Sequence, residues 1–387
     1  MKTSDKNNID INNNNKKDNI IDKIFLKKYR CTERIRKGSF GYIYKAEFNN
    51  KYYALKLENN KISNLLENEA SLMIYLKGPN IPYITTYGVS GGYNILVMQL
   101  LGKDLQVLLN EKGPFSVKTT SIIGYQMISI LEHIHNKNVI HRDIKPENFS
   151  MGLEEKSNYL YILDFGLAKT FNKESIKTNK NGKRKLIGTP RYASINALRG
   201  FEQSQRDDLE SVGYALVYLL KGELPWQGIK IKNKIQKIKS ILVNKIETCS
   251  TDLCSGLPEE YEEFIDYCRD LEINDKPNYS MLKNLFLKIL QKEKQEFDYI
   301  YDWSINNSDV KNNNVTVVKN QNIYNSFNKN NNINILLTEN RPIVIQNNNH
   351  LIGISKENKE YENKDDKNKE NNNIKGKEQD VCCCLIY

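Results

Sequence analysis

The hydrophobic pattern of this chain changes its period near residue 110. Before that point, residues 29–48 and 51–58 alternate apolar with polar side chains and are rich in aromatic residues, which predicts strands joined by a glycine turn. After it, residues 121–136 carry apolar side chains at helical spacing, and residues 209–220 (LESVGYALVYLL) are apolar nearly all round, as in a buried helix. We expect Asp208 to be the N-cap of that last helix. The pattern predicts an α+β fold with a small β-rich lobe, a larger helical lobe and a ligand site in the cleft between them.

Two flanking segments differ from this block in composition. Residues 1–24 and 304–387 are rich in Asn and Lys, with runs such as NNNN and NKDDKNKENNN. Such segments bury too little apolar surface to offset the entropy of ordering, so we expect both to be disordered. One folded domain is therefore predicted over residues 29–303.

The charge balance and the cysteines narrow the function class. A net charge of +10 suits an anionic partner, but the excess is not gathered into one basic arm and the aromatic residues lie in core-like patterns. A nucleic-acid binder is therefore disfavoured. Four of the seven cysteines are scattered without zinc or disulfide spacing, which is typical of a reducing, intracellular compartment. No apolar run reaches the roughly 18–20 residues of a membrane-spanning helix.

The segment RKGSFG (36–41) partly fits the phosphate-loop pattern G-x-G-x-x-G. Gly38 and Gly41 occupy the second and third glycine positions, whereas Arg36 occupies the first. Glycines allow backbone N–H groups to approach a phosphate closely. The fragment taken alone suits a plain hairpin turn equally well.

Lys56 and Glu69 form a second predicted element. Lys56 lies in the apolar strand pattern, and Glu69 lies in the middle of the apolar stripe of a helix predicted over residues 64–76. A core-facing carboxylate without a cation is costly, so we predict an ion pair between the two. Glu67, on the opposite helix face, is expected to be solvated. Phosphoryl-transfer enzymes use such a lysine–glutamate pair.

The segment VIHRDIKPENF (139–149) gathers an acid, a base and an amide. Asp143 is suited to accept the proton of an attacking hydroxyl, and Lys145 to neutralise a transferring phosphoryl group. Asn148 can offer an amide oxygen to Mg²⁺, and Asp164, at the end of an apolar strand in YILDFGLAK, is the second expected ligand. Each segment alone could be a solvated turn. Their order and spacing together favour phosphoryl transfer.

With these motifs the sequence resembles the eukaryotic protein kinases and, more narrowly, the casein kinase I family. The narrower resemblance rests on HRDIKPENFSMG, DFGLAK, GTPRYASINA, LPWQG and FDYIYDW, with SIN where most kinases have Ala-Pro-Glu. It covers about residues 29–303. The tau-tubulin kinases share RYASIN and LPW but fit EQSQRDDLES and LPWQG less well. The resemblance implies a two-lobed protein kinase fold that uses ATP and Mg²⁺ to phosphorylate Ser or Thr of protein substrates, and Lys145 matches the serine/threonine type.

The resemblance also implies roles for residues around the cleft. The segment that covers the ATP phosphates is implied to comprise Ile35, Arg36, Lys37, Gly38, Ser39, Phe40, Gly41, Tyr42 and Ile43. Lys56 is implied to hold the phosphates, Met98 to be the gatekeeper beside the adenine, and Gln99 to Leu101 to form the hinge. Arg191, Gly228 and Lys237 are implied to form an anion pocket that reads a phosphate already present on the substrate, upstream of the target hydroxyl. The basic activation segment KTNKNGKRK (177–185) agrees with acidic or pre-phosphorylated substrates.

Arg36 departs from the family pattern. Its side chain is open to three interpretations: it points to solvent, it contacts a phosphate, or it marks a damaged nucleotide site. The corresponding alternatives in function are an active kinase and a pseudokinase scaffold. Retention of the six residues expected to carry the chemistry favours the active enzyme: Lys56, Glu69, Asp143, Lys145, Asn148 and Asp164.

The chain ends in VCCCLIY, which the Asn-rich composition before it does not explain. Adjacent cysteines cannot easily wrap one zinc ion, and a reducing cytosol disfavours a disulfide. We therefore expect lipidation of Cys382, Cys383 or Cys384, either as prenylation of a Cys-aliphatic-aliphatic-X end with an atypical Tyr or as S-palmitoylation, against an unmodified tail. Some casein kinase I relatives are tethered in this way. The expected location is the cytoplasm with a lipid-tethered membrane fraction, and a nuclear pool stays open; the sequence does not indicate the oligomeric state.

Overall fold

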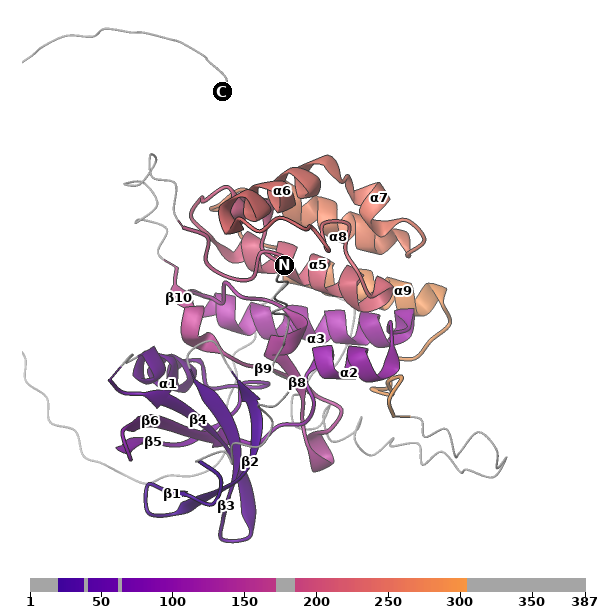
Figure 1. Cartoon of the computed structure of the whole chain (residues 1–387). Helices are drawn as coiled ribbons and strands as arrows, with labels where there is room; N and C mark the ends of the chain where they lie inside the picture. The colour runs from indigo at the N-terminus through magenta and orange to yellow at the C-terminus, as the bar shows by residue number, and fades with distance from the viewer. Residues whose placement is uncertain (1–19, 38–40, 62–64, 172–184, 305–387) are drawn as a thin grey trace, which may run out of the picture. The chain divides into compact units, whose positions relative to one another are not determined.

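The computed structural model describes residues 20–37, 41–61, 65–171 and 185–304. In this part of the chain a small β-rich lobe precedes a larger helical lobe, as the periodicity predicts (Figure 1). The change from strands to helices falls near residue 100, where β6 ends and α2 follows.

The small lobe is a six-stranded antiparallel sheet with one helix. The strand order is β1-β2-β3-β4-β6-β5. The elements are β1 (Ile24–Phe25), β2 (Tyr29–Lys37), β3 (Tyr42–Phe48), β4 (Lys51–Asn59), α1 (Leu65–Leu76), β5 (Ile84–Ser90) and β6 (Tyr93–Gln99). Five consecutive residues of β4, from Ala54 to Glu58, are buried because this strand lies inside the sheet between β3 and β6. That position carries Lys56 into the interior of the lobe.

The small lobe begins earlier than the sequence pattern predicts. Residues 20–24, which we assigned to the disordered N-terminal segment, pack onto the sheet. Ile20 is buried in the same core cluster as Cys31 and Tyr44, and the Asp22 N–H donates to the Cys31 carbonyl at 2.8 Å. Two adjacent isoleucines after a long Asn-rich run are too short a segment to give a periodic signal, so only the packing reveals their place.

The large lobe is built around two long helices. Its helices are α2 (Leu105–Lys112), α3 (Val117–Asn136), α4 (Ile195–Leu198), α5 (Gln205–Lys221), α6 (Lys234–Glu247), α7 (Ser250–Cys254), α8 (Glu259–Asp270) and α9 (Tyr279–Lys292). Helix α3 packs against α5 and α9, and α8 also covers α5 (Figure 1). Every residue from Asp207 to Leu219 of α5 is buried, as expected for a helix that is apolar nearly all round.

Two short strand pairs face the small lobe. Strand β7 (Val139–Ile140) pairs with β10 (Lys169–Thr170), and β8 (Phe149–Met151) pairs with β9 (Leu160–Ile162). The two pairs hold the segment 141–148 and the turn after β9 side by side. These are the segments that carry the predicted acids and amide.

The prediction that Asp208 caps α5 is wrong. The N-cap is Ser204, whose backbone N–H donates to Asp207 Oδ2 at 2.7 Å. Asp208 lies within the first turn and is buried. Instead of capping α5, its carboxylate accepts hydrogen bonds from the backbone of the segment that contains Asp143.

The ordered chain continues beyond α9. Asp302 accepts hydrogen bonds from the N–H and hydroxyl of Ser116, the N-cap of α3, at 2.8 and 2.7 Å. Tyr301 donates to the Asn158 carbonyl at 2.6 Å, and Trp303 packs against Phe115. The FDYIYDW stretch therefore belongs to the large lobe. Among the described residues, no helix is both long and apolar enough to cross a bilayer.

Candidate active site

A pocket opens between the two lobes. One wall comes from β2, β3, β4, β6 and α1, and the other comes from the chain between β6 and α2 and from the segments around β8 and β9. The lining residues are Ile35, Arg36, Lys37, Ile43, Ala54, Lys56, Glu69, Met98, Gln99, Leu100, Leu101, Gly102, Asp104, Lys145, Asn148, Ser150, Leu163 and Asp164. Most of the residues expected to bind a nucleotide or a metal thus border one cavity.

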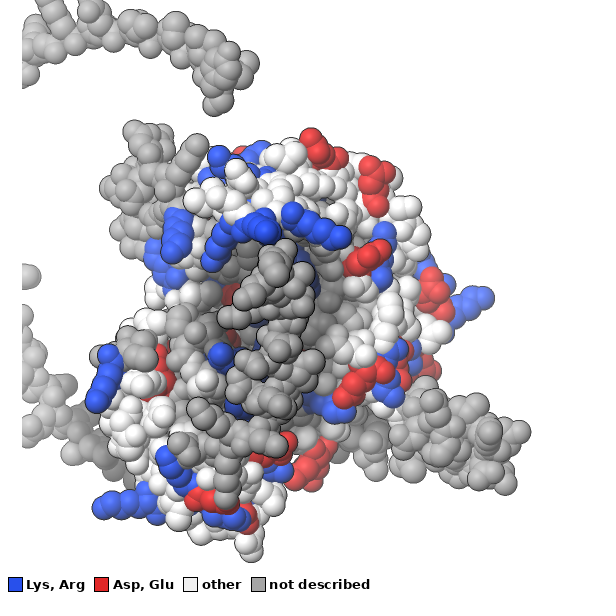
Figure 2. Space-filling model, viewed as in Figure 1, with Lys and Arg blue, Asp and Glu red and all other residues white. Residues whose placement is uncertain are grey.

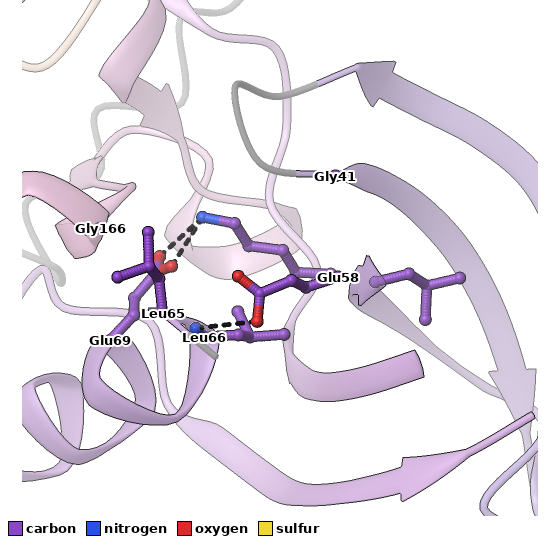
Figure 3. A pocket seen from close by; sticks show the side chains of 8 residues that line it. Gly41, Glu58, Leu65, Leu66, Glu69 and Gly166 are labelled. Atoms are coloured by element: carbon purple, nitrogen blue, oxygen red, sulfur yellow. Dashed lines mark hydrogen bonds and ion pairs between the residues drawn. The ribbon is translucent and has the colours of Figure 1, made fainter. Parts of the chain in front are cut away.

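The predicted ion pair between Lys56 and Glu69 is present. Lys56 Nζ donates to both carboxylate oxygens of Glu69, at 2.8 and 2.7 Å, and Glu69 points inward from α1 (Figure 3). A third contact, to Asp164 Oδ1 at 2.8 Å, joins this pair to the large lobe. Glu67, two residues before Glu69 on α1, is exposed as predicted.

Lys56 and Asp164 stabilise each other in the charged form, whereas burial raises the pKa of Glu69. Burial by itself lowers the pKa of Lys56, but the carboxylates of Glu69 and Asp164 outweigh it and hold the pKa above its ordinary range. Burial raises the pKa of Asp164, yet Lys56 and then His141 and Lys145 bring it below its usual value. The site therefore keeps a fixed cation and a fixed anion in contact at neutral pH.

The carboxylate of Asp208 holds the backbone of the Asp143 segment in place. Its Oδ2 accepts from the backbone N–H of His141 at 2.7 Å and from His135 Nε2 at 3.0 Å, while its Oδ1 accepts from the N–H of Arg142 at 2.8 Å. Arg142 has a φ of 67°, a conformation that non-glycine residues adopt only when the surroundings enforce it. The buried carboxylate supplies that enforcement.

Asp143 itself is held by two side chains from different segments. Lys145 Nζ lies 2.5 Å from Asp143 Oδ2, and the Thr189 hydroxyl donates to Asp143 Oδ1 at 2.7 Å. Lys145 also contacts the Thr189 hydroxyl at 3.3 Å. Gly188, with a φ of 102°, passes so close to the Arg142 carbonyl that a Cβ would lie 2.4 Å from it. The segment after residue 185 is thus packed directly against the acid.

Asn148 and Asp164 offer the oxygen ligands expected for a magnesium ion. The Asn148 amide donates through Nδ2 to the Asp143 carbonyl at 2.8 Å, which leaves its Oδ1 as an acceptor. Asp164 uses Oδ1 for Lys56, and both residues line the same pocket. Within the described residues no group of three or more His, Cys, Asp or Glu forms a metal site. Two protein oxygens nonetheless fit Mg²⁺, which keeps several waters and takes further ligands from substrate phosphates.

The expected nucleotide residues divide into three groups. Ile35, Lys37, Ile43, Met98 and Leu101 line the pocket. Tyr42 does not, and Gly41 borders a smaller neighbouring cavity, where a Cβ would lie 1.9 Å from the Leu57 carbonyl. Gly41 is therefore required by a close approach of two strands, whatever its part in phosphate binding. Gly38, Ser39 and Phe40 lie outside the described residues, as does most of the activation segment (172–184) and the Cys382–Cys384 cluster.

Arg36 does not point to solvent. Its Nη1 donates to the backbone carbonyl of Glu147 at 2.7 Å and lies 3.4 Å from Asp104 Oδ2. Both partners belong to the large lobe. The first of the three interpretations of this departure is therefore wrong, and the side chain reaches across the pocket.

In the expected anion pocket, the backbone of Arg191 is hydrogen-bonded to the segment that contains Gly228. Trp226 Nε1 donates to the Arg191 carbonyl at 2.7 Å, and the guanidinium lies over the rings of Tyr192 and Tyr218. Gly228 is exposed, has a φ of 71° and faces open space, and Lys237 is exposed on the first turns of α6. Lys and Arg side chains gather over the region of α6 (Figure 2).

Several residues of the site escaped the sequence analysis. They are Ala54 and Leu163 in the pocket wall, Asp104 opposite Arg36, Thr189 on Asp143, and Asp208. Asp208 comes just before the apolar run of α5, so a capping role was the simplest interpretation. Its polar neighbours in the chain gave no signal that it is buried.

Replacement of Asp208 by Asn is expected to lower the free energy of unfolding by about 2–3 kcal/mol. Asparagine has one acceptor oxygen, so its NH₂ group must face the N–H of either His141 or Arg142, donor against donor. Urea unfolding followed by circular dichroism measures the effect. Asp270→Asn, an exposed aspartate at the end of α8, is the control and should change stability by less than about 0.5 kcal/mol. Equal stability of both variants would contradict the anchoring role.

A comparison with known protein families agrees with this geometry. The family model described as protein kinase domain matches residues 29–287, which include both walls of the pocket, the Lys56–Glu69 pair and the Asp143 segment. The chain therefore belongs to the protein kinase domain family, whose members transfer a phosphoryl group from ATP to protein substrates.

Proposed function

We propose that this kinase is a serine/threonine kinase of the casein kinase I type. The observation that carries the first part is the contact of Lys145 and Thr189 with the same carboxylate, Asp143. A cation held beside the acid stands where it can meet the phosphoryl group during transfer to a small hydroxyl. The sequence features GTPRYASINA, LPWQG and FDYIYDW support the narrower class.

In this proposal the residues of the pocket divide the chemistry. Asp143 orients and accepts the proton of the substrate hydroxyl, and Lys56 holds the ATP phosphates, with Glu69 positioning Lys56. Asn148 and Asp164 hold Mg²⁺, which neutralises charge on the phosphates when bound. Met98 to Leu101 border the adenine. Incubation with Mg-ATP and casein, followed by phosphoamino-acid analysis, tests the proposal: phosphoserine or phosphothreonine supports it, and phosphotyrosine alone refutes it.

The preferred substrates are proposed to carry a phosphate or acidic residues upstream of the target. Arg191 follows Thr189, whose hydroxyl donates to Asp143, by only two residues. Arginine recognises phosphate through two directional, charge-assisted hydrogen bonds. Exposed lysines at 230, 232, 234, 237 and 239 add positive potential nearby (Figure 2).

Arg191→Ala should lower kcat/KM on a primed phosphopeptide by about 10-fold or more, and on the same peptide without its phosphate by less than about threefold. Arg199→Ala, an exposed arginine at the end of α4, is the matched control and should affect neither peptide. Equal losses on both peptides would remove Arg191 from substrate recognition. Because Pro190 and Trp226 constrain this segment, thermal unfolding of the variant is compared with the parent first.

We also propose that the C-terminal cysteines tether the kinase to membranes. Lipid chains on two or more of Cys382, Cys383 and Cys384 would hold the protein stably, since one chain binds only marginally. The expected result is that the full-length protein fractionates with membranes and that a variant with all three residues changed to Ser does not. Hydroxylamine separates a thioester from a prenyl thioether. A wholly soluble parent with an unmodified C-terminal mass would leave a cytosolic kinase without a tether.

A further inference from the structure

The pocket between the lobes has two chemically distinct ends. Ala54, Met98, Leu101 and Leu163 make one end apolar, whereas Lys56, Lys145, Asn148 and Asp164 make the other end polar and charged. A nucleotide has an apolar base and a charged triphosphate, so its base belongs at the first end and its phosphates at the second. The sugar that joins them must cross the middle of the pocket.

Arg36 occupies the middle. One of its partners, Asp104, follows Leu101 by three residues, and the other, the Glu147 carbonyl, immediately precedes Asn148. Leu101, Asp104 and Asn148 all line the pocket. The sugar of a nucleotide carries hydroxyl groups, which donate hydrogen bonds to acceptors such as these two oxygens. Asp104 has only one oxygen to offer, because its Oδ1 already accepts the Val107 N–H as the N-cap of α2. Arg36 takes the other oxygen, Oδ2.

The contact also joins the two lobes. Arg36 belongs to β2, and both partners belong to the large lobe, 68 and 111 residues along the chain. The bond to the Glu147 carbonyl, at 2.7 Å, is short and charge-assisted, whereas the longer approach to Asp104 is a partly exposed ion pair. The contact is therefore strong enough to be populated and weak enough for a ligand to displace.

We propose that Arg36 is a latch across the nucleotide pocket, which the sugar of an incoming nucleotide must displace, so that this residue sets the nucleotide affinity of the kinase. The inference rests on the proposed role of the pocket as the ATP site. A binding-competent state that is only partly populated lowers the apparent affinity in proportion to its population. Loss of the latch therefore tightens binding, which is the opposite of what loss of a ligand contact does.

Adenosine is the probe that isolates this effect, because it has the base and sugar but no phosphate for a cation to attract. Isothermal titration of adenosine is expected to show a dissociation constant about threefold to tenfold lower for Arg36→Met than for the parent. Methionine keeps the apolar stem of arginine and cannot donate a hydrogen bond. Arg36→Lys should fall between the two.

Lys51→Met is the matched control. Lys51 lies in the same lobe at the start of β4, outside the pocket, and its exposed side chain makes no hydrogen bond or ion pair with the described residues. Its replacement removes the same charge from the same lobe and should leave the adenosine dissociation constant within twofold of the parent. The KM for a peptide substrate is measured for each variant and should not change. A general distortion of the small lobe would alter this KM as well as the dissociation constant of adenosine.

The outcomes separate the latch from the nucleotide site itself. Adenosine binding by Arg36→Met that equals the parent, or is weaker, overturns the latch, as does an equal gain in Lys51→Met. If adenosine and Mg-ATP bind neither the parent nor Arg36→Met, the proposed ATP site fails and the latch fails with it. Adenosine binding by Arg36→Met but not by the parent supports the latch.

Discussion

Asp143→Asn is expected to lower the rate constant for phosphoryl transfer by about 10²–10⁴-fold while leaving Mg-ATP affinity close to that of the parent. The substitution preserves shape but removes the carboxylate that would accept the hydroxyl proton. It also leaves Lys145 without its anionic partner, because Lys145 Nζ lies 2.5 Å from Asp143 Oδ2 in the parent protein. Single-turnover transfer to casein measures the chemical step, and Mg-ATP titration measures binding.

The fold should tolerate this change. The Asn148 amide bonds the backbone carbonyl of residue 143, and the Asp208 carboxylate holds the preceding backbone, so neither contact depends on the Asp143 side chain. Transfer at the parent rate by Asp143→Asn would show that another group accepts the proton. Absence of transfer in the parent itself, with Mg-ATP bound, would indicate a pseudokinase.

The Lys56–Glu69 pair should give the second large effect. Lys56→Met and Glu69→Gln are each expected to lower kcat/KM about 10²-fold or more, since each leaves the phosphate-binding cation absent or misplaced. Lys56→Met also leaves Glu69, only 4% exposed, without its closest cation, and removal of one partner of a buried pair costs about 3–5 kcal/mol. The double variant should be markedly less impaired than the sum of the two.

The control for this cycle lies on the same helix. Glu67→Gln removes a carboxylate from the exposed face of α1 and should leave activity and stability near the parent values. Additive losses in Lys56→Met and Glu69→Gln would mean that the two residues act separately, despite their separation of 2.7 Å. Urea unfolding of all variants separates loss of fold from loss of chemistry.

The sequence by itself determined those features that local patterns reveal. The change of period gave the two lobes, because a strand or a helix must repeat its apolar residues every two or 3.6 positions to bury one face. The pairing of Lys56 with Glu69 followed from the apolar stripe around Glu69, since a buried carboxylate requires a cation. The Asp143, Asn148 and Asp164 motifs indicated phosphoryl transfer because their residue types and order suit few other chemistries.

Only the tertiary structure decided which distant residues meet. Asp208 reaches Arg142 across 66 residues, Thr189 reaches Asp143 across 46, and Arg36 reaches Glu147 across 111. None of these contacts has a periodic signature, because a hydrogen bond between two loops depends on where the lobes place them and not on the residues beside them in the chain. For this reason Asp208 looked like a helix cap, and Arg36 stayed open to three interpretations. Long-range packing turned the first into the anchor of the Asp143 segment and carried the second across the nucleotide pocket.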